Sequence, residues 1–271
     1  MSEDPPQLSE SEEREVEERS PPRARVVHAA VVKQGDDELE RPVGSLFWSG
    51  LAAGIAITAS IWAQGGLHQR LPDAPWRELV AGLGYTLGFI IVILGRMQLF
   101  TEHTMVAVLP LAQEPNRNNL RRTARLWSVV FVGNVIGAAI MSALCVHAHL
   151  VSPELLGAMT DVSGKLLEKS AGEILLQGIP AGFLIASVAW IRSAANDSGF
   201  WIVLILTYAI ALGGFTHVIA GAVEAFLLLW TGKAGLGWVF GTFLVPALIG
   251  NIIGGTGLFA MLAHAQVKEE I

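Results

Sequence analysis

The sequence predicts an all-α integral membrane protein, a six-helix bundle built from two inverted three-helix repeats with broken second and fifth helices. Three observations support this fold class. The 271 residues are 52% hydrophobic and only 15% charged, with a mean hydropathy of +0.50, whereas soluble domains carry about 25% charge. Six apolar segments are each close to the ~20 residues that cross a bilayer. Two of these segments carry similar polar interruptions.

The first 43 residues differ from the rest of the chain. They hold 12 of the 24 acidic residues and 6 of the 18 basic ones, with few large apolar side chains. Such a composition is typical of disorder, although Glu10–Arg19 could form a transient charged helix without an apolar face. We therefore expect a disordered acidic cytoplasmic tail over residues 1–43, with a docking or regulatory arm as the alternative. A transmembrane domain over residues 44–268 follows.

Six predicted spans make up this domain. They are Gly44–Ala63, Leu79–Leu111, Leu126–Ala148, Ala171–Ile191, Phe200–Leu229 and Trp238–Ala265. The second and the fifth are too long for one plain helix that crosses a bilayer. We expect each of these two spans to be interrupted.

The interruptions fall at Gln98–Thr104 and Gly213–Val218. Non-helical backbone at membrane depth is tolerated only where it is buried in protein or lines a cavity. A buried break would also shield Arg96 from lipid, where a charge is costly. Paired broken helices in the two halves of a membrane protein indicate a substrate site near the midplane, so this pattern points to transport.

The third and sixth spans also match each other. Gly133-Asn134-Val-Ile-Gly137 resembles Gly250-Asn251-Ile-Ile-Gly254, and small residues four apart let helix backbones approach closely. The order of plain helix, broken helix and glycine-asparagine helix thus occurs twice, over residues 44–148 and 171–265. Because each copy has three spans, the second must be inverted relative to the first.

Basic residues indicate the orientation. The connection after the second span carries Arg117, Arg121, Arg122 and Arg125, and Arg192 follows the fourth span. Placing these loops in the cytoplasm puts both termini there, in a multi-pass protein of the inner (plasma) membrane. The bias is modest, because the opposite loops also hold five basic residues: Arg70, Arg77, Lys165, Lys169 and Lys233.

At the breaks and the last span, the chain resembles the formate/nitrite transporter family of pentameric anion channels. The resemblance covers about residues 40–268 and rests on Leu99-Phe-Thr101, Gly214-Phe-Thr-His217 and Pro246-Ala-Leu-Ile-Gly-Asn251-Ile-Ile-Gly-Gly255. The run from Gly84 to Ile91 and the ending His264-Ala-Gln266 look closer still to the YfdC-like inner-membrane branch. The resemblance implies an aquaporin-like bundle, one pore per protomer and a homo-pentamer in the lipid bilayer.

The resemblance also implies a site for a small anionic substrate. His217 matches a histidine midway through the pore, Thr101 the threonine opposite it, and Asn251 an asparagine near it. The apolar pore constrictions fall on Tyr85, Phe89, Leu99, Ile185 and Ile210.

His217 suits the transport of weak acids. A bare anion in an apolar slit pays a large desolvation cost, which hydrogen-bond donors or a proton can offset. Histidine, with a pKa of about 6.5, can supply either. We expect the anion to exchange a proton near His217 while Thr101 and Asn251 hold the imidazole or the substrate. The alternative is a histidine that only packs between helices, but its place in a membrane break favours a role in transport.

Other polar residues in the spans have two interpretations each. Glu102, His103 and Glu224 are candidates for proton transfer or gating, and a structural tie is the alternative for Glu224. Metal binding is disfavoured, because the histidines show no closely spaced pair. Near the start of the fourth span, Glu173, Lys165 and Lys169 form either an outer charge group or a solvated loop. No cofactor motif, nucleotide loop or nucleophile elbow indicates an enzyme, and no nucleic-acid partner is expected.

The chain departs from the family pattern at three positions. Thr216 stands where a Glu usually precedes the central histidine, Ile210 replaces a phenylalanine, and Gly182 replaces an asparagine of the fourth span. The slit would therefore differ in shape, and larger weak acids are open as substrates besides formate and nitrite. Two other functions compete with an anion channel. One is an aquaporin-like pore for neutral solutes, disfavoured because no Asn-Pro-Ala pair occurs. The other is a non-conducting membrane scaffold or sensor.

Overall fold

The computed structural model describes residues 9, 11–12, 15, 20–195 and 198–271, and within these ranges the chain forms helices and no strands. Most of the helix suggested for Glu10–Arg19 lies outside the described residues. Five of the helical segments are long and apolar enough to cross a membrane: Val43–His68, Arg77–Leu94, Arg117–His147, Ala171–Ala194 and Trp238–Val267. Two shorter apolar helices, Gly199–Leu212 and Val218–Trp230, flank the second break.

The first repeat follows the predicted order. Its elements are α3 (Val43–Ala56), α4 (Ala59–His68), α5 (Arg77–Leu94), α6 (Phe100–Val106), α7 (Leu109–Gln113) and α8 (Arg117–His147). The first span is one helix with a turn at residues 57–58, and the predicted second span divides into α5, α6 and α7. The third span begins at Arg117, well before the predicted Leu126, because the polar residues 117–125 continue the same helix.

The second repeat has the same plan. It consists of α10 (Ala171–Ala194), α11 (Gly199–Leu212), α12 (Val218–Trp230) and a last span made of η3 (Trp238–Leu244), α13 (Val245–Ile252), η4 (Ile253–Ala260) and α14 (Met261–Val267). The η3 and η4 stretches widen to π-helical hydrogen bonding. Each half-helix after a break packs on the other repeat, α6 on α10 and η4, and α12 on α8. The breaks therefore meet inside the bundle.

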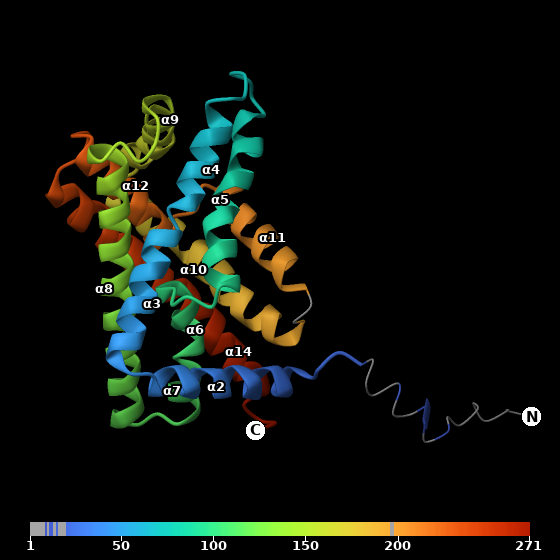
Figure 1. Ribbon diagram of the computed structural model, residues 1–271. Coiled ribbons are helices and arrows are strands. Elements are labelled where there is room, and N and C mark those ends of the chain that lie inside the picture. The colour runs from blue at the N-terminus through green and yellow to red at the C-terminus, as the bar shows by residue number, and fades with distance from the viewer. Residues whose placement is uncertain (1–8, 10, 13–14, 16–19, 196–197) are drawn as a thin grey trace, which may run out of the picture.

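Three elements were not predicted. The chain forms α2 (Ala24–Glu40), so the prediction of a disordered tail is wrong for these residues. The physical reason is a four-residue spacing of small and apolar side chains, Val27, Val31, Gly35 and Leu39, which are buried on one face. At the opposite end of the bundle, α9 (Pro153–Gly164) packs on α4 and α12, and η1 (Lys165–Glu168) connects it to α10 (Figure 1).

The two repeats run in opposite directions. Helix α3 begins at the end of the bundle where α2 lies, and α10 ends there (Figure 1). Ala189 and Arg192, near the end of α10, line one cavity together with Ala30 and Gln34 of α2. Helix α14 also packs on α2. The predicted inversion is confirmed.

Both breaks have the same backbone geometry. Arg96 and Gly214 adopt left-handed conformations, with φ of 56° and 60°. In each break one N–H reaches back to a carbonyl five residues earlier: Met97 to Val92 and Phe215 to Ile210, both at 3.0 Å. This pattern is a Schellman helix ending. The chain then runs extended through Leu99 and His217 into the next helix.

A buried asparagine holds each break. The amide of Asn134 accepts from Phe100 N–H (2.9 Å) and donates to the carbonyls of Gly50 and Gln98 (2.8 Å each). The amide of Asn251 accepts from Val218 N–H (2.9 Å) and donates to the carbonyls of Gly178 (2.9 Å) and Thr216 (2.8 Å). The repeat inferred from sequence therefore extends to individual hydrogen bonds.

Glycines allow these asparagines to reach their partners. A Cβ atom on Gly54 of α3 or on Gly182 of α10 would overlap the carbonyl oxygen of Asn134 or Asn251, respectively. The close helix packing predicted from the glycine-asparagine motifs follows from this contact.

Candidate functional site

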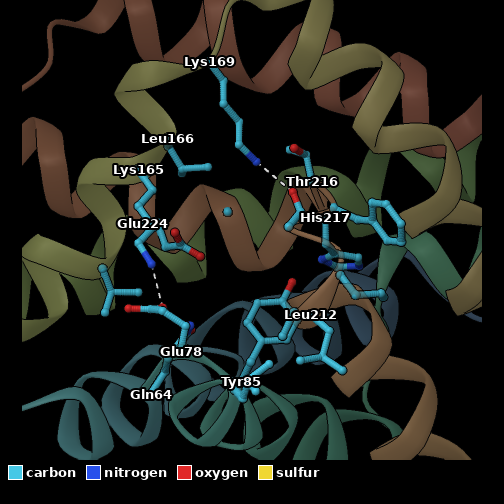
Figure 2. A pocket seen from close by; sticks show the side chains of 18 residues that line it. Gln64, Glu78, Tyr85, Lys165, Leu166, Lys169, Leu212, Thr216, His217 and Glu224 are labelled. Carbon is cyan, nitrogen blue, oxygen red and sulfur yellow. Dashed lines mark hydrogen bonds and ion pairs between the residues drawn. The ribbon is translucent and has the colours of Figure 1, made fainter. Parts of the chain in front are cut away.

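A cavity of about 290 Å³ leads from the end of the bundle at α9 and η1 to the second break (Figure 2). Residues of α4, α5, α9, η1, α11, α12 and the break line it. Its polar lining residues are Gln64, Glu78, Tyr85, Lys165, Lys169, Thr216, His217 and Glu224. We call this cavity the vestibule. Gln64 and Glu78 were not expected here, since the connection between the first two spans carries no motif.

His217 lies at the inner end of the vestibule, in the turn before α12. Its ring is 1% exposed, and its Nδ1 accepts a hydrogen bond from Ala220 N–H at 3.1 Å. A neutral imidazole whose Nδ1 is an acceptor carries its proton on Nε2. Nε2 lies 2.7 Å from Thr101 Oγ1, so the ring donates and the hydroxyl accepts. The Thr101 hydroxyl proton is then left for another acceptor.

The hydrogen bond from His217 to Thr101 joins the two broken helices. Thr101 belongs to α6 of the first repeat, and His217 precedes α12 of the second. The structure thus brings together the two residues that the sequence placed opposite each other. The Phe89 ring meets the imidazole edge to face, with centroids 4.9 Å apart, which fixes the ring plane.

Asn251 was expected to hold the imidazole or the substrate, but its amide contacts the backbone instead. All three hydrogen bonds of its amide go to backbone atoms of α10 and the second break. A primary amide has little hydrogen-bonding capacity beyond these three bonds. In the described part of the chain, Asn251 therefore shapes the turn that carries His217. Asn134 does the same for the turn that carries Leu99, although the sequence analysis did not single it out as a site residue.

The five predicted constriction residues fall into two groups. Tyr85 and Ile210 line the vestibule. Phe89, Leu99 and Ile185 do not line it and are each 0% exposed. The vestibule therefore ends at His217, where the buried Phe89 ring packs against the imidazole.

Charged side chains surround the vestibule. Lys165 Nζ forms an ion pair of 2.6 Å with Glu78 Oε2, and Lys169 Nζ donates to the carbonyl of Gly214 at 2.7 Å. Lys169 thus contacts the break that carries His217. Burial lowers the pKa of Lys169, and the negative charges of Glu224 and Glu173 partly oppose this effect.

Three other predicted residues do not line the vestibule. Glu173 caps α10, where its carboxylate accepts from Ser170 N–H at 2.8 Å. Glu102 Oε1 lies 3.5 Å from Arg192 Nη1, in a second cavity of about 170 Å³ at the opposite end of the bundle. His103 is buried, and within the described residues its Nδ1 has no hydrogen-bond partner. Of the four titratable residues predicted near the breaks, only His217 and Glu224 line the vestibule.

Comparisons with known proteins bear on this arrangement. The sequence model of the formate/nitrite transporter family matches residues 25–265. Inner membrane protein YfdC of Escherichia coli (strain K12) is 37% identical over 255 residues, which are 94% of this chain and 82% of that protein. Formate channel BtFdhC of Bacillus thuringiensis is 24% identical over 248 residues, or 87% and 93% of the two chains.

Two solved structures have the same fold. A pentameric formate channel with formate bound matches with a TM-score of 0.71 at 19% identity, over 84% of this chain and 98% of that one. An ion channel described as a member of the FNT family matches with a TM-score of 0.74 at 18% identity, over 90% and 98%. These matches confirm the predicted aquaporin-like bundle.

Proposed function

The chain belongs to the formate/nitrite transporter family and is a membrane channel or transporter for anions, and we propose that it carries small monovalent anions of weak acids, such as formate and nitrite. We further propose a homo-pentamer with one pore in each protomer. A solved relative of the same fold is described as pentameric, which supports this assembly.

We propose that the protein lies in the inner membrane with α2 and α14 on the cytoplasmic side. The relative YfdC is described as an inner membrane protein. Helices α2 and α14 pack together at one end, and Arg122 at the start of α8 lies 3.7 Å from Asp36 of α2. The arginine-rich start of α8 is thus at that end, as the positive-inside rule favours. The vestibule would then open to the outside.

The observation that carries the proposed function is the placement of the hydrogen bond between His217 and Thr101. It lies at the inner end of a charged vestibule, where the buried Phe89 ring packs against the imidazole. A permeating molecule must leave its water there, and burying a charge without partners is costly. The Thr101 hydroxyl can donate to an oxygen atom of the molecule while His217 donates to that hydroxyl.

This geometry changes the expected source of the proton. Both ring nitrogens of His217 already form hydrogen bonds inside the protein. A proton on Nδ1 would require the bond from Ala220 N–H to break. We propose that His217 stays neutral and orients Thr101, and that the anion acquires its proton elsewhere in the vestibule.

Flux measurements on the purified protein in liposomes test the proposed function. Oligomer mass in detergent is measured first, and five copies of the 29.0 kDa chain are expected. Influx of ¹⁴C-formate should then exceed that of empty liposomes and rise as the external pH falls. Uptake of an uncharged solute that does not depend on pH would instead indicate an aquaporin-like pore. A pentamer with no flux of either kind would indicate a scaffold or sensor.

A further inference from the structure

Glu224 is a carboxylate in the vestibule wall, and no role has been assigned to it above. It lies on α12, seven residues after His217, and is half-buried. Figure 2 shows its side chain pointing into the vestibule beside Lys165. Among the described residues, its carboxylate has no hydrogen bond and no ion pair, whereas Lys165 pairs with Glu78 and Lys169 bonds to Gly214.

The charge of the vestibule depends on Glu224. The other titratable groups that line it are Glu78 and Tyr85 of α5, Lys165 and Lys169 before α10, and His217. Glu78 neutralises Lys165, and His217 is neutral with both nitrogens bonded. The remaining charges are Lys169 and Glu224. An ionised Glu224 cancels Lys169 and repels an entering anion, whereas a protonated Glu224 leaves a net positive vestibule.

A protonated Glu224 is also a proton donor within reach of that anion. Of the other groups, Lys169 is held at the Gly214 carbonyl, and His217 has no free nitrogen. On the basis of the proposed function, we propose that Glu224 is the proton-exchange residue of the vestibule and converts the anion of a weak acid to its neutral form before it reaches Thr101.

The proton transfer is balanced without a further reactant. The O–H bond of the Glu224 carboxylic acid breaks, and an O–H bond forms on an oxygen of the anion. Glu224 is left as a carboxylate, which the positive charges of Lys169 and Lys165 stabilise. A hydronium ion of the solution outside the vestibule returns a proton to Glu224 and is left as water. The neutral acid then passes Thr101 and the apolar residues Phe89, Leu99 and Ile185 without the desolvation cost of a charge.

Glu224→Gln tests this proposal, because glutamine keeps the size of the side chain but releases no proton at these pH values. The probe is ¹⁴C-formate influx into proteoliposomes at external pH 5 to 8. At pH 7, where the solution holds almost no neutral acid, influx should fall at least fivefold relative to the wild type. At pH 5 the solution supplies more of the neutral acid, so the reduction should be smaller.

Glu168→Gln is the matched control. It removes the same charge at the same end of the bundle, but from an exposed carboxylate of η1 that does not line the vestibule. Its influx should stay within twofold of the wild type at every pH. An influx profile of Glu224→Gln that overlaps the wild-type profile would overturn the proposal. So would a Glu168→Gln profile identical to that of Glu224→Gln, since a general field effect would then suffice.

Glu224→Asp covers the case in which Glu224→Gln does not assemble. It keeps a titratable carboxyl group one methylene shorter, so influx should retain its pH dependence, and loss of that dependence would contradict the proposal. The two proposals fail in different ways. If the wild type shows no formate influx, the proposed function fails. If the wild type conducts formate and Glu224→Gln has the wild-type pH profile, only the role of Glu224 fails.

Discussion

At the scale of single residues, the hydrogen bond between Thr101 and His217 makes a specific prediction. Thr101→Val keeps the shape of the side chain but removes the acceptor of the Nε2 proton at 2.7 Å. A buried donor left without a partner costs about 1–3 kcal/mol. The free energy of unfolding of the variant should therefore be lower than that of the wild type by about this amount. Its formate influx should fall several-fold, because the Thr101 hydroxyl is no longer there to donate to the permeating molecule.

Thr104→Val provides the comparison for that experiment. The Thr104 hydroxyl lies on the same short helix and donates to the Thr101 carbonyl at 2.7 Å. Its loss removes one hydrogen bond but leaves the lining of the vestibule unchanged. Denaturant unfolding should show a loss of about 1 kcal/mol, and influx should stay within twofold of the wild type. Equal influx through Thr101→Val and the wild type would remove Thr101 from the permeation path.

The same residues show how far a sequence motif determines a site. The resemblance to the formate/nitrite transporter family implied that Thr101 lies opposite His217, and the two residues do form a hydrogen bond. The positions of Glu102 and His103 were not predictable, although they directly follow Thr101. Successive residues of a helix point about 100° apart, so Glu102 faces Arg192 instead of the vestibule. Spacing within a motif cannot replace knowledge of the helix orientation.

At the scale of elements, the asparagines determine the shape of the breaks. Asn134→Leu removes three hydrogen bonds, to Phe100, Gly50 and Gln98. Each buried backbone group left unpaired costs about 1–3 kcal/mol, so we expect one of the largest losses of stability in the chain. The turn that carries Leu99 should loosen. Thermal unfolding and protease sensitivity at residues 95–99 measure these effects.

Asn119→Leu on the same helix is a suitable reference for Asn134→Leu. Asn119 is also buried, but its side chain donates only to Glu114 O and accepts from Arg122 at the end of the bundle. The Asn119→Leu variant should lose less stability than Asn134→Leu, and residues 95–99 should stay resistant to protease. If the two variants are equally stable, the first break does not depend on the asparagine amide.

The elements also differ in how well their sequences predict them. Spans and breaks were predictable because a membrane requires long apolar segments and tolerates interruptions only inside protein. Helix α2 was not, since charged residues such as Asp36 and Asp37 surround a narrow face of Val27, Val31 and Leu39. That face becomes apparent only when the sequence is read at a four-residue period.

At the scale of the whole molecule, α2 connects both repeats. It packs on α6, α7 and α8 of the first repeat and on α10 and α14 of the second. Glu38 accepts a hydrogen bond at 3.0 Å from Gln98, which lies in the first break. The helix before the first span therefore touches the turn that carries Leu99. A change in the docking of α2 would reach the first break by this contact.

The docking of α2 should depend on pH through His28. Its Nε2 lies 3.2 Å from His264 Nδ1 of α14, and burial, followed by the positive charge of His264, lowers the pKa of His28. The docked state then binds fewer protons than the free helix below the ordinary pKa of about 6.5. Stability of the contact therefore rises with pH through that window and is lost as the pH falls.

Hydrogen exchange of residues 24–40 at pH 7.5 and 5.5, corrected for the intrinsic rate, measures this dependence. We expect lower protection of α2 at pH 5.5, and His28→Phe should remove the difference because it cannot take up a proton. His147→Phe, at the end of α8 remote from α2, should keep it. Equal protection of wild-type α2 at both pH values would show that His28 does not link protonation to docking.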